Sequence, residues 1–424
     1  MFSERTNWRL ASNRFTQAVE QAHAQGAHLL DLTASNPTRV GLEYDSETIL
    51  AALRSDRALD YDPQAKGLLS ARQAVARYYS QQCSRGKRDV ARNVSPTGFE
   101  FDPERILLTT GTSEGYSFAF RLLCNAGDEL LVPKPSYPLF EFLADLQDVK
   151  LVPYPLIYDH GWQMDFDSMS KAVSPRTRGV VLVHPNNPTG SYVHASEVGQ
   201  LNEFCRARGL SLIVDEVFLD YVLDSADCGA VERPSTGQTG APVHTSPEPA
   251  PSFAFNEDVL TFTLSGLSKI SALPQMKVAW IVTSGPEQQV SPAMARLEVI
   301  ADTYLSMNAP VQWAVPVMLQ QRKRIHQQLM ERIQSNLAEL DRQLAGQPSS
   351  QRLDIEGGWY TVLRVPVTRS DEELAIELVR ERSVVVHPGH FYDFESDGYL
   401  VLSLITKQNE FAEGIRRLLD YLHT

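Results

Sequence analysis

The chain has few cysteines, no long apolar run and no signal-like start. Its 424 residues include four cysteines that are far apart and form no CxxC pair: Cys83, Cys124, Cys205 and Cys228. This spacing predicts reduced thiols in an intracellular protein. No stretch approaches the roughly 18 consecutive apolar residues of a membrane span, and the N-terminal segment lacks the apolar core of a signal peptide. We therefore expect a cytoplasmic protein with no membrane partner.

Basic residues are outnumbered by acidic ones. The 39 lysines and arginines against 52 aspartates and glutamates give a formal net charge of −13. Proteins that bind nucleic acids carry a basic patch, and no run of Lys or Arg stands out here, so we expect no nucleic-acid partner. The cysteines and histidines show no metal-ligand spacing, so no metal is predicted. An acidic balance favours solubility but does not identify a substrate.

Apolar runs that alternate with helical patterns predict an α/β fold. Strands are expected at six places in the first two thirds of the chain: 105–110, 129–135, 179–185, 210–216, 259–264 and 276–282. The runs are mostly continuous in Val, Ile and Leu, as expected for parallel strands that are buried on both faces. Helical segments lie between them, for example at 113–124 and 195–208. The pattern therefore predicts a large domain with a mostly parallel central sheet.

The rest of the chain predicts a second, smaller unit, since 424 residues exceed the usual size of one domain. After a long helix at 311–345, three strands and a final helix are expected: 359–365, 383–388, 398–405 and 410–422. We predict a large domain over 45–315 and a small α+β domain built from 1–44 and 316–424. Segment 224–257 is rich in Pro, Gly, Ser and Thr, which predicts a poorly ordered surface insertion.

Chemically active residues follow the predicted strands, at the edge where ligands bind in open α/β sheets. One residue or short turn follows each of five strands: Gly111-Thr112-Ser113, Tyr137, Asn187, Asp215 and Lys269. Each has an ordinary interpretation on its own: an N-cap, a core aromatic, a polar turn, a satisfied carboxylate and a solvated lysine. Together they supply what pyridoxal phosphate requires: an amine, an anion-binding helix start, an aromatic face, a donor and a carboxylate.

Five segments of the chain resemble the class I/II aminotransferases of fold type I, the relatives of aspartate and alanine aminotransferase. They are YDPQAKGLLSARQAVARYY (61–79), LLVPKPSYPLF (130–140), PNNPTG (185–190), VDE (214–216) and SGLSK (265–269). The resemblance covers the chain from about Leu32 to the C-terminus. It implies the pyridoxal-phosphate-dependent transferase fold, pyridoxal phosphate as the cofactor, and an amino acid and a 2-oxo acid as substrates.

The resemblance also implies roles for individual residues. Lys269 is expected to bind the cofactor covalently and to move the substrate proton, and Asp215 to pair with the ring nitrogen. The other implied cofactor contacts are Asn187 to the phenolic oxygen, Tyr137 to the ring face, and Gly111, Thr112, Ser113, Ser265 and Lys277 to the phosphate. Tyr61 matches a tyrosine that reaches the neighbouring subunit's phosphate, which implies a homodimer. Asn36 and Arg39 match the loop that approaches the substrate.

Five positions depart from the family's pattern, and two of them, Gln275 and Ala279, stand where glycines are usual. Lys277 stands where relatives have arginine. Phe218 replaces a tyrosine whose hydroxyl helps to hold the cofactor's phenolic oxygen. Asn187 then takes a larger share in stabilising that oxygen, unless the Tyr221 hydroxyl also reaches it. Val401 stands where relatives place the arginine that binds the substrate's α-carboxylate. Either Arg39 supplies the missing cation, or Arg39 is a solvated surface residue and the substrate presents an apolar or neutral group at this position.

The residues and the resemblance together predict an aminotransferase that works by a ping-pong mechanism. One alternative keeps the cofactor and changes the reaction, giving a lyase, decarboxylase or racemase on the same fold. A second alternative is a non-catalytic binding scaffold, which the retention of Lys269, Asp215 and Asn187 disfavours.

Overall fold

The computed structural model describes residues 2–8, 10–86, 101–138, 140–223, 250–305 and 307–423. Most of the predicted insertion, from 224 to 249, lies outside the described residues. Its last part, from 250 to 257, is packed instead of loose, because Phe253 and Ala254 are buried. No helix in the described ranges is long and apolar enough to cross a membrane.

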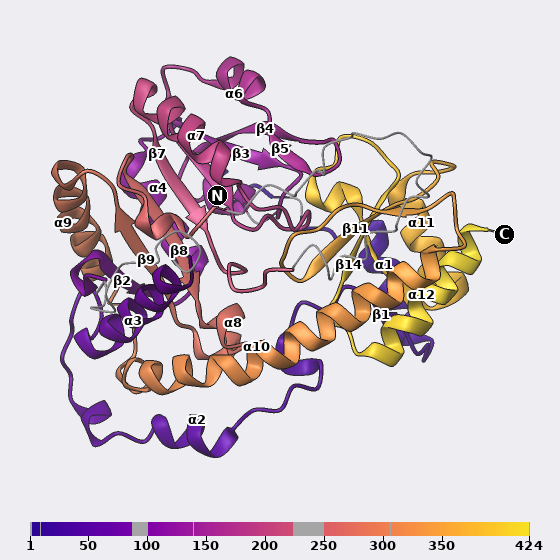
Figure 1. Cartoon of the computed structure of the whole chain (residues 1–424), viewed down its shortest axis with the longest axis horizontal. Helices are drawn as coiled ribbons and strands as arrows, with labels where there is room; N and C mark the ends of the chain where they lie inside the picture. Colours follow the sequence, from indigo (N-terminus) through magenta and orange to yellow (C-terminus); the bar gives the residue numbers. More distant parts are fainter. Residues whose placement is uncertain are drawn as a thin grey trace, which may run out of the picture.

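An eight-stranded sheet forms the larger part of the molecule (Figure 1). Its strands lie in the order β2-β9-β8-β7-β6-β3-β4-β5, and β8 through β4 run parallel, while β9 and β5 are antiparallel to their neighbours. Their bounds are β2 Ile106–Thr109, β3 Glu129–Lys134, β4 Lys150–Tyr158, β5 Trp162–Met164, β6 Thr177–Val183, β7 Ser211–Asp215, β8 Thr261–Gly266 and β9 Ala279–Ser284.

Helices cover both faces of this sheet, which explains the continuous apolar runs. In β7, Ile213 packs toward α4 and α9, while Leu212 and Val214 pack toward α7 on the opposite face. The helices of this part are α2 Ser46–Ala52, α3 Leu69–Gly86, α4 Thr112–Leu123, α5 Phe140–Asp145, α6 Phe166–Ala172, α7 Ala195–Arg208, α8 Leu267–Ile270 and α9 Glu287–Tyr304.

A four-stranded antiparallel sheet forms the second part, in the order β10-β11-β14-β13. The strands are β10 Gln351–Arg352, β11 Tyr360–Arg364, β13 His387–Pro388 and β14 Tyr399–Ser403, with helices α1 Arg14–Ala24, α11 Asp371–Glu377 and α12 Gln408–Leu422. The single strand predicted at 383–388 is wrong. The chain changes sheets there: β12, Val384–Val385, pairs with β1, Leu30–Asp31, and β13 pairs with β14.

The helix α10, Ala309–Leu344, joins the two parts and runs beneath both in orange (Figure 1). Its first half packs Ala314 and Met318 into the cluster that contains α3. Its second half packs Leu329 and Leu337 into the cluster of the smaller sheet. One helix therefore contributes to two hydrophobic cores.

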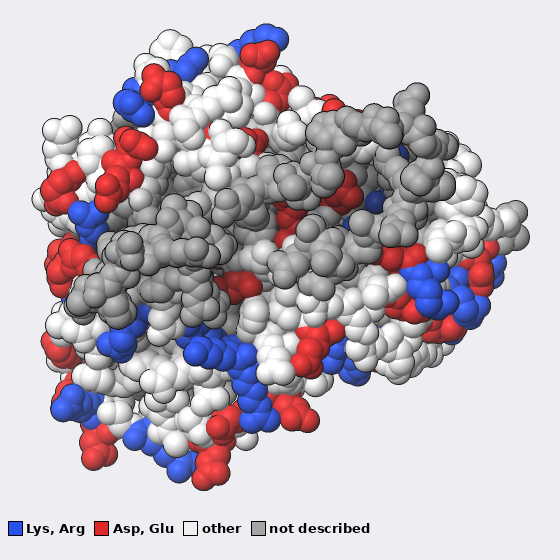
Figure 2. All heavy atoms as spheres, in the orientation of Figure 1, with Lys and Arg blue, Asp and Glu red and all other residues white. Residues whose placement is uncertain are grey.

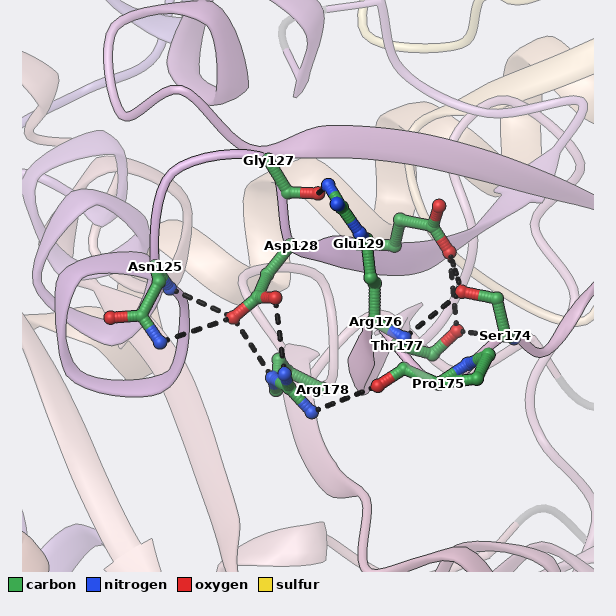
Figure 3. Close-up of polar contacts among 9 residues, drawn as sticks. All are labelled: Asn125, Gly127, Asp128, Glu129, Ser174, Pro175, Arg176, Thr177 and Arg178. Carbon is green, nitrogen blue, oxygen red and sulfur yellow. Dashed lines mark hydrogen bonds and ion pairs between the residues drawn. The ribbon is translucent and has the colours of Figure 1, made fainter.

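Polar contacts fix the amino ends of β3 and β6, at the edge opposite the strand ends where the predicted site residues lie (Figure 3). The Arg178 guanidinium donates to both carboxylate oxygens of Asp128, over 2.9 and 3.1 Å. The backbone N–H of Asn125 donates to the same carboxylate over 2.9 Å. On the face shown in Figure 2, acidic and basic side chains of the described residues are interspersed.

Candidate active site

Strand pairing brings the predicted site residues together at the carboxyl edge of the large sheet. In the register of the central strands, Val183 of β6 lies beside Asp215 of β7, which lies beside Leu264 of β8. The turn after β6 carries Asn187, and the short helix after β8 carries Lys269. Residues that are far apart in the sequence therefore meet because parallel strands end at the same edge.

Lys269 is partly buried in the short helix α8, with its amine among aromatic rings. Its Nζ lies 4.8 Å from the centroid of the Trp359 ring and 5.6 Å from that of Phe218. Burial lowers the pKa of Lys269 to about 8, and the nearby charge of Asp215 partly opposes this shift. About one amine in ten is then neutral at pH 7, so Lys269 can act as a nucleophile and base.

Asp215 presents a carboxylate at the end of β7. Its Oδ1 accepts a hydrogen bond from the backbone N–H of Val217 at 3.0 Å, and its Oδ2 accepts one from the hydroxyl of Tyr116 at 3.1 Å. Burial raises the pKa of Asp215 to about 6, while these donors and Lys269 lower it. The carboxylate is therefore mostly charged at pH 7, inside a site that favours a cationic partner.

The start of α4 offers unpaired backbone donors. Gly111 is the N-cap, and the N–H groups of Thr112 and Ser113 have no hydrogen-bond partner within the described part of the chain. A Cβ placed on Gly111 would meet no atom within 4 Å, so the space beside the helix start is open. Such a helix start can hold a phosphate.

Asn187 and Tyr137 lie on two different loops, and hydrogen bonds of Asn186 hold these loops together. The Asn186 amide donates to the carbonyl of Pro135 at 3.1 Å, and Ser136 donates to Asn186 at 3.2 Å. Asn187 is 8% exposed, and its Oδ1 is buried without a hydrogen-bond partner in the described structure. Burial and the charge of Asp215 raise the pKa of Tyr137, as expected for an aromatic residue close to that carboxylate.

Three further predicted cofactor residues make no hydrogen bond to the described site residues named above. The Ser265 hydroxyl is buried and donates to the carbonyl of Glu216 over a long 3.4 Å. Lys277 is exposed and has a left-handed backbone, with φ of 53°. Tyr61 is 81% exposed and lines a different pocket of about 370 Å³, together with Trp313. Phosphate contact by these three residues stays a prediction.

The predicted substrate loop lies beside the smaller sheet. Asn36 caps a short 3-10 helix, Pro37–Arg39, by accepting hydrogen bonds from the N–H and hydroxyl of Thr38. The guanidinium of Arg39 is exposed and makes no ion pair with a described residue. Val401 is fully buried in the hydrophobic cluster of the smaller sheet.

Sequence reasoning missed several residues of the site. Tyr116 follows the spacing of a core residue in α4, and only the fold shows that its hydroxyl reaches Asp215. Trp359 gave no signal beyond a strand pattern, yet its ring lies beside the Lys269 amine. The Tyr221 hydroxyl donates to the carbonyl of Lys269 at 2.7 Å, so it positions α8 instead of replacing the hydroxyl that Phe218 lacks.

The fold and this edge of the sheet define a pyridoxal-phosphate-dependent aminotransferase of fold type I. The sequence profile of the family "aminotransferase class I and II" matches residues 27–418, and the chain belongs to this family. The predicted family, the α/β fold class, the use of pyridoxal phosphate and the aminotransferase activity are confirmed.

Similar proteins cover most of the chain. The glutamate-pyruvate aminotransferase AlaA of Haemophilus influenzae is 27% identical over 409 residues, which span 94% of this chain and 91% of the relative. The protein of that name from Escherichia coli K12 is 30% identical over 301 residues, which span 71% of this chain and 66% of the relative. Among solved structures, the alanine aminotransferase from Pyrococcus furiosus has a TM-score of 0.82 at 18% identity, with both chains fully covered. An Escherichia coli aminotransferase has a TM-score of 0.80 at 24% identity and covers 100% of this chain and 98% of its own.

The residues at the site fit pyridoxal phosphate. Asn187 carries a buried polar atom without a partner, and the start of α4 has open space and unpaired N–H groups. Asp215 is a partly buried carboxylate with a raised pKa, and Lys269 is a partly buried amine with a lowered pKa. These features match a ligand with a phosphate, a phenolic oxygen, a basic ring nitrogen and a carbon that reacts with amines.

Proposed function

We propose that Lys269 and Asp215 are the catalytic residues of this aminotransferase. The main support is that the partly buried amine of Lys269, with a pKa of about 8, lies close enough to the carboxylate of Asp215 for the two charges to interact. The enzyme moves an amino group between an amino acid and a 2-oxo acid. Bound pyridoxal phosphate supplies a carbon that reacts with amines and a ring that accepts electrons.

The proposed cofactor contacts follow the site's geometry. Asp215 would hold the ring nitrogen, Asn187 the phenolic oxygen and Tyr137 the ring face. The N–H groups of Thr112 and Ser113, next to Gly111, would hold the phosphate, with Ser265 and Lys277 as further predicted contacts. The unpaired N–H groups and the partnerless Asn187 side chain support this assignment.

The proton steps fall to Lys269. Its Nζ would move the proton from the substrate's Cα to the C4′ carbon of the bound cofactor, and in the opposite direction when the second substrate reacts. Trp359 and Phe218 border the amine, and the burial of Lys269 keeps its pKa low enough for this role. Asp215 keeps its negative charge through the cycle, because its two hydrogen bonds stabilise the carboxylate.

We propose glutamate and pyruvate as the substrate pair, because the two bacterial relatives described above carry the name glutamate-pyruvate aminotransferase. Asn36 and Arg39 would approach the substrate. The unpaired guanidinium of Arg39 supports a role in binding a carboxylate.

We further propose a cytoplasmic homodimer whose protomers divide into domains at 45–315 and at 1–44 with 316–424. Tyr61 and Leu59 are 81% and 91% exposed, which is unusual for large apolar side chains and fits a surface that a second copy covers. Sedimentation tests the dimer.

Single-turnover analysis tests the reaction. The loaded enzyme is mixed with glutamate in the absence of any 2-oxo acid, and the products are separated. We expect about one equivalent of 2-oxoglutarate per active site and none of the products of decarboxylation, elimination or racemisation. Continuous product formation without an acceptor would contradict transamination.

A further inference from the structure

A pocket of about 350 Å³ lies between the predicted substrate loop and the start of α12. Asn36, Arg39 and His387 are among the residues that line it. A volume of this size suits a small organic ligand. Its polar side chains are therefore candidates for binding a substrate carboxylate.

The pocket is tied to the proposed active site through Tyr392. The backbone N–H of Ser136, next to Tyr137, donates to the Tyr392 carbonyl at 2.9 Å. The Tyr392 hydroxyl lies 3.0 Å from Nδ1 of His387. Tyr137 is thus connected to the imidazole of His387 through its chain neighbour Ser136, through Tyr392 and through these two hydrogen bonds.

His387 lies beside Val401. The antiparallel register of β13 and β14 places these two residues directly opposite each other. Side chains that face each other in this way project from the same face of the sheet, about 5 Å apart at Cβ. Val401 is fully buried and apolar, and of the two residues paired with it across the sheet, Val362 is apolar and His387 is polar.

The hydrogen bond to Tyr392 leaves one ring nitrogen of His387 available. The Tyr392 hydroxyl is buried and has no other acceptor among the described residues, so we assign it as the donor to Nδ1, because a buried O–H needs an acceptor. The proton of a neutral imidazole then resides on Nε2. Burial lowers the pKa of His387 to about 4, with Asp31 opposing the shift, so the ring is neutral at pH 7. Nε2 has no hydrogen-bond partner in the part of the chain that the structure describes.

Other charges around the pocket are largely satisfied. Lys407 pairs with Glu410 at 3.2 Å, and Asp31 accepts hydrogen bonds from the N–H and hydroxyl of Thr33. Arg39 remains the unpaired cation among the described lining residues. A neutral N–H donor and a free guanidinium on one pocket suit a carboxylate.

We propose that Nε2–H of His387 binds the α-carboxylate of the substrate, together with the guanidinium of Arg39. His387 thereby supplies the hydrogen-bond donor that Val401 does not provide. This inference rests on the proposed transamination, which fixes what the substrate is.

The test compares His387→Ala and His387→Gln with the matched control His390→Ala, which removes an exposed histidine from the same segment. KM and kcat are measured with alanine and with glutamate as amino donors. Losing one hydrogen bond should raise KM for both donors roughly 5–20-fold, with kcat changed less than about threefold. His387→Gln, which keeps an N–H donor, should recover most of the loss, and His390→Ala should match the unmodified enzyme.

Unchanged KM values in His387→Ala would overturn the proposal. A rise for glutamate alone would also overturn it, because that result would place His387 at the side-chain carboxylate. If His387→Ala does not fold, Tyr392→Phe removes only the hydroxyl that fixes the tautomer, and it should raise KM for both donors about two- to fivefold. Failure of the unmodified enzyme to form any 2-oxo acid would instead contradict the proposed function.

Discussion

The hydroxyl of Tyr116 donates a hydrogen bond to Oδ2 of Asp215 over 3.1 Å. The two residues are 99 positions apart, one in α4 and the other at the end of β7. Burial alone would raise the pKa of Asp215, and the Tyr116 hydroxyl is one of the groups that lower it again, to about 6. Tyr116 therefore acts on the site by keeping the carboxylate ionised.

Replacing Tyr116 with phenylalanine should raise the pKa of Asp215. A hydrogen bond to a charged group is worth about 1.5–3 kcal/mol, which corresponds to roughly one to two pH units. The charged carboxylate exists above its pKa, so cofactor affinity should be lost at a higher pH in Tyr116→Phe than in the unmodified protein. Fluorescence titrations of the cofactor-free protein from pH 5 to 9 measure this, with the exposed Tyr304→Phe as control. Identical pH profiles would separate Tyr116 from the function of Asp215.

Asp215→Asn should separate activity from stability. Asn keeps both hydrogen bonds, because its oxygen can accept from Val217 and its amide can donate to the Tyr116 oxygen. Loss of the charge should slow the proton-transfer step on the order of 10³-fold, about 4 kcal/mol.

The same variant should stabilise the cofactor-free protein at high pH. The folded pKa of Asp215, about 6, lies above the ordinary value of 3.8, so the energetic cost of ionising it grows between these values and persists above pH 6. At pH 8 the free energy of unfolding should rise by up to about 3 kcal/mol in urea titrations. For activity, near-normal turnover by Asp215→Asn would show that Asp215 is not the partner of the ring nitrogen.

Much of the fold follows from local sequence, and the exceptions have physical causes. The run LSLIV predicts β7 because both faces of that strand are buried. β4 gave no such signal, since it contains Pro153 and Pro155 and only Tyr154 within it is buried, while its other residues are partly buried or exposed. Lys269 and Asp215 could be predicted because they follow strands. Tyr116 and His387 could not, because their importance arises from hydrogen bonds and strand pairing across the fold.

Glu216 should make stability depend on pH. It is 1% exposed, and its carboxyl group accepts hydrogen bonds from the Ser252 hydroxyl and the Phe253 N–H. Burial raises the pKa of Glu216 to about 8, above the ordinary 4.5. Between these values the folded protein holds a proton that the unfolded chain releases, so stability falls as pH rises.

Glu216→Gln removes this titration and keeps the hydrogen-bonding shape. The fall in unfolding free energy between pH 5.5 and 7.5 should become less steep by up to about 1.4 kcal/mol per pH unit. Urea unfolding of the cofactor-free proteins at both pH values measures it. Parallel slopes in the two proteins would show that Glu216 is ionised in the folded state.

Arg39→Ala should weaken substrate binding. The guanidinium lines the pocket next to Asn36 and has no carboxylate partner among the described residues. Loss of a charge-assisted hydrogen bond should lower kcat/KM roughly 10–100-fold, about 1.5–3 kcal/mol. Steady-state kinetics with glutamate measure the loss, and Arg296→Ala, on the distant helix α9, is the control. Unchanged kinetics would remove Arg39 from the substrate site.

Covalent labelling of Lys269 tests the central claim most directly. The protein is loaded with pyridoxal phosphate, treated with borohydride, digested and analysed by mass spectrometry, alongside a Lys269→Ala variant treated identically. The recessed, partly neutral amine of Lys269 should carry the reduced cofactor in the unmodified protein, and the variant should carry none. The label on another lysine, or equal labelling of the variant, would contradict the account.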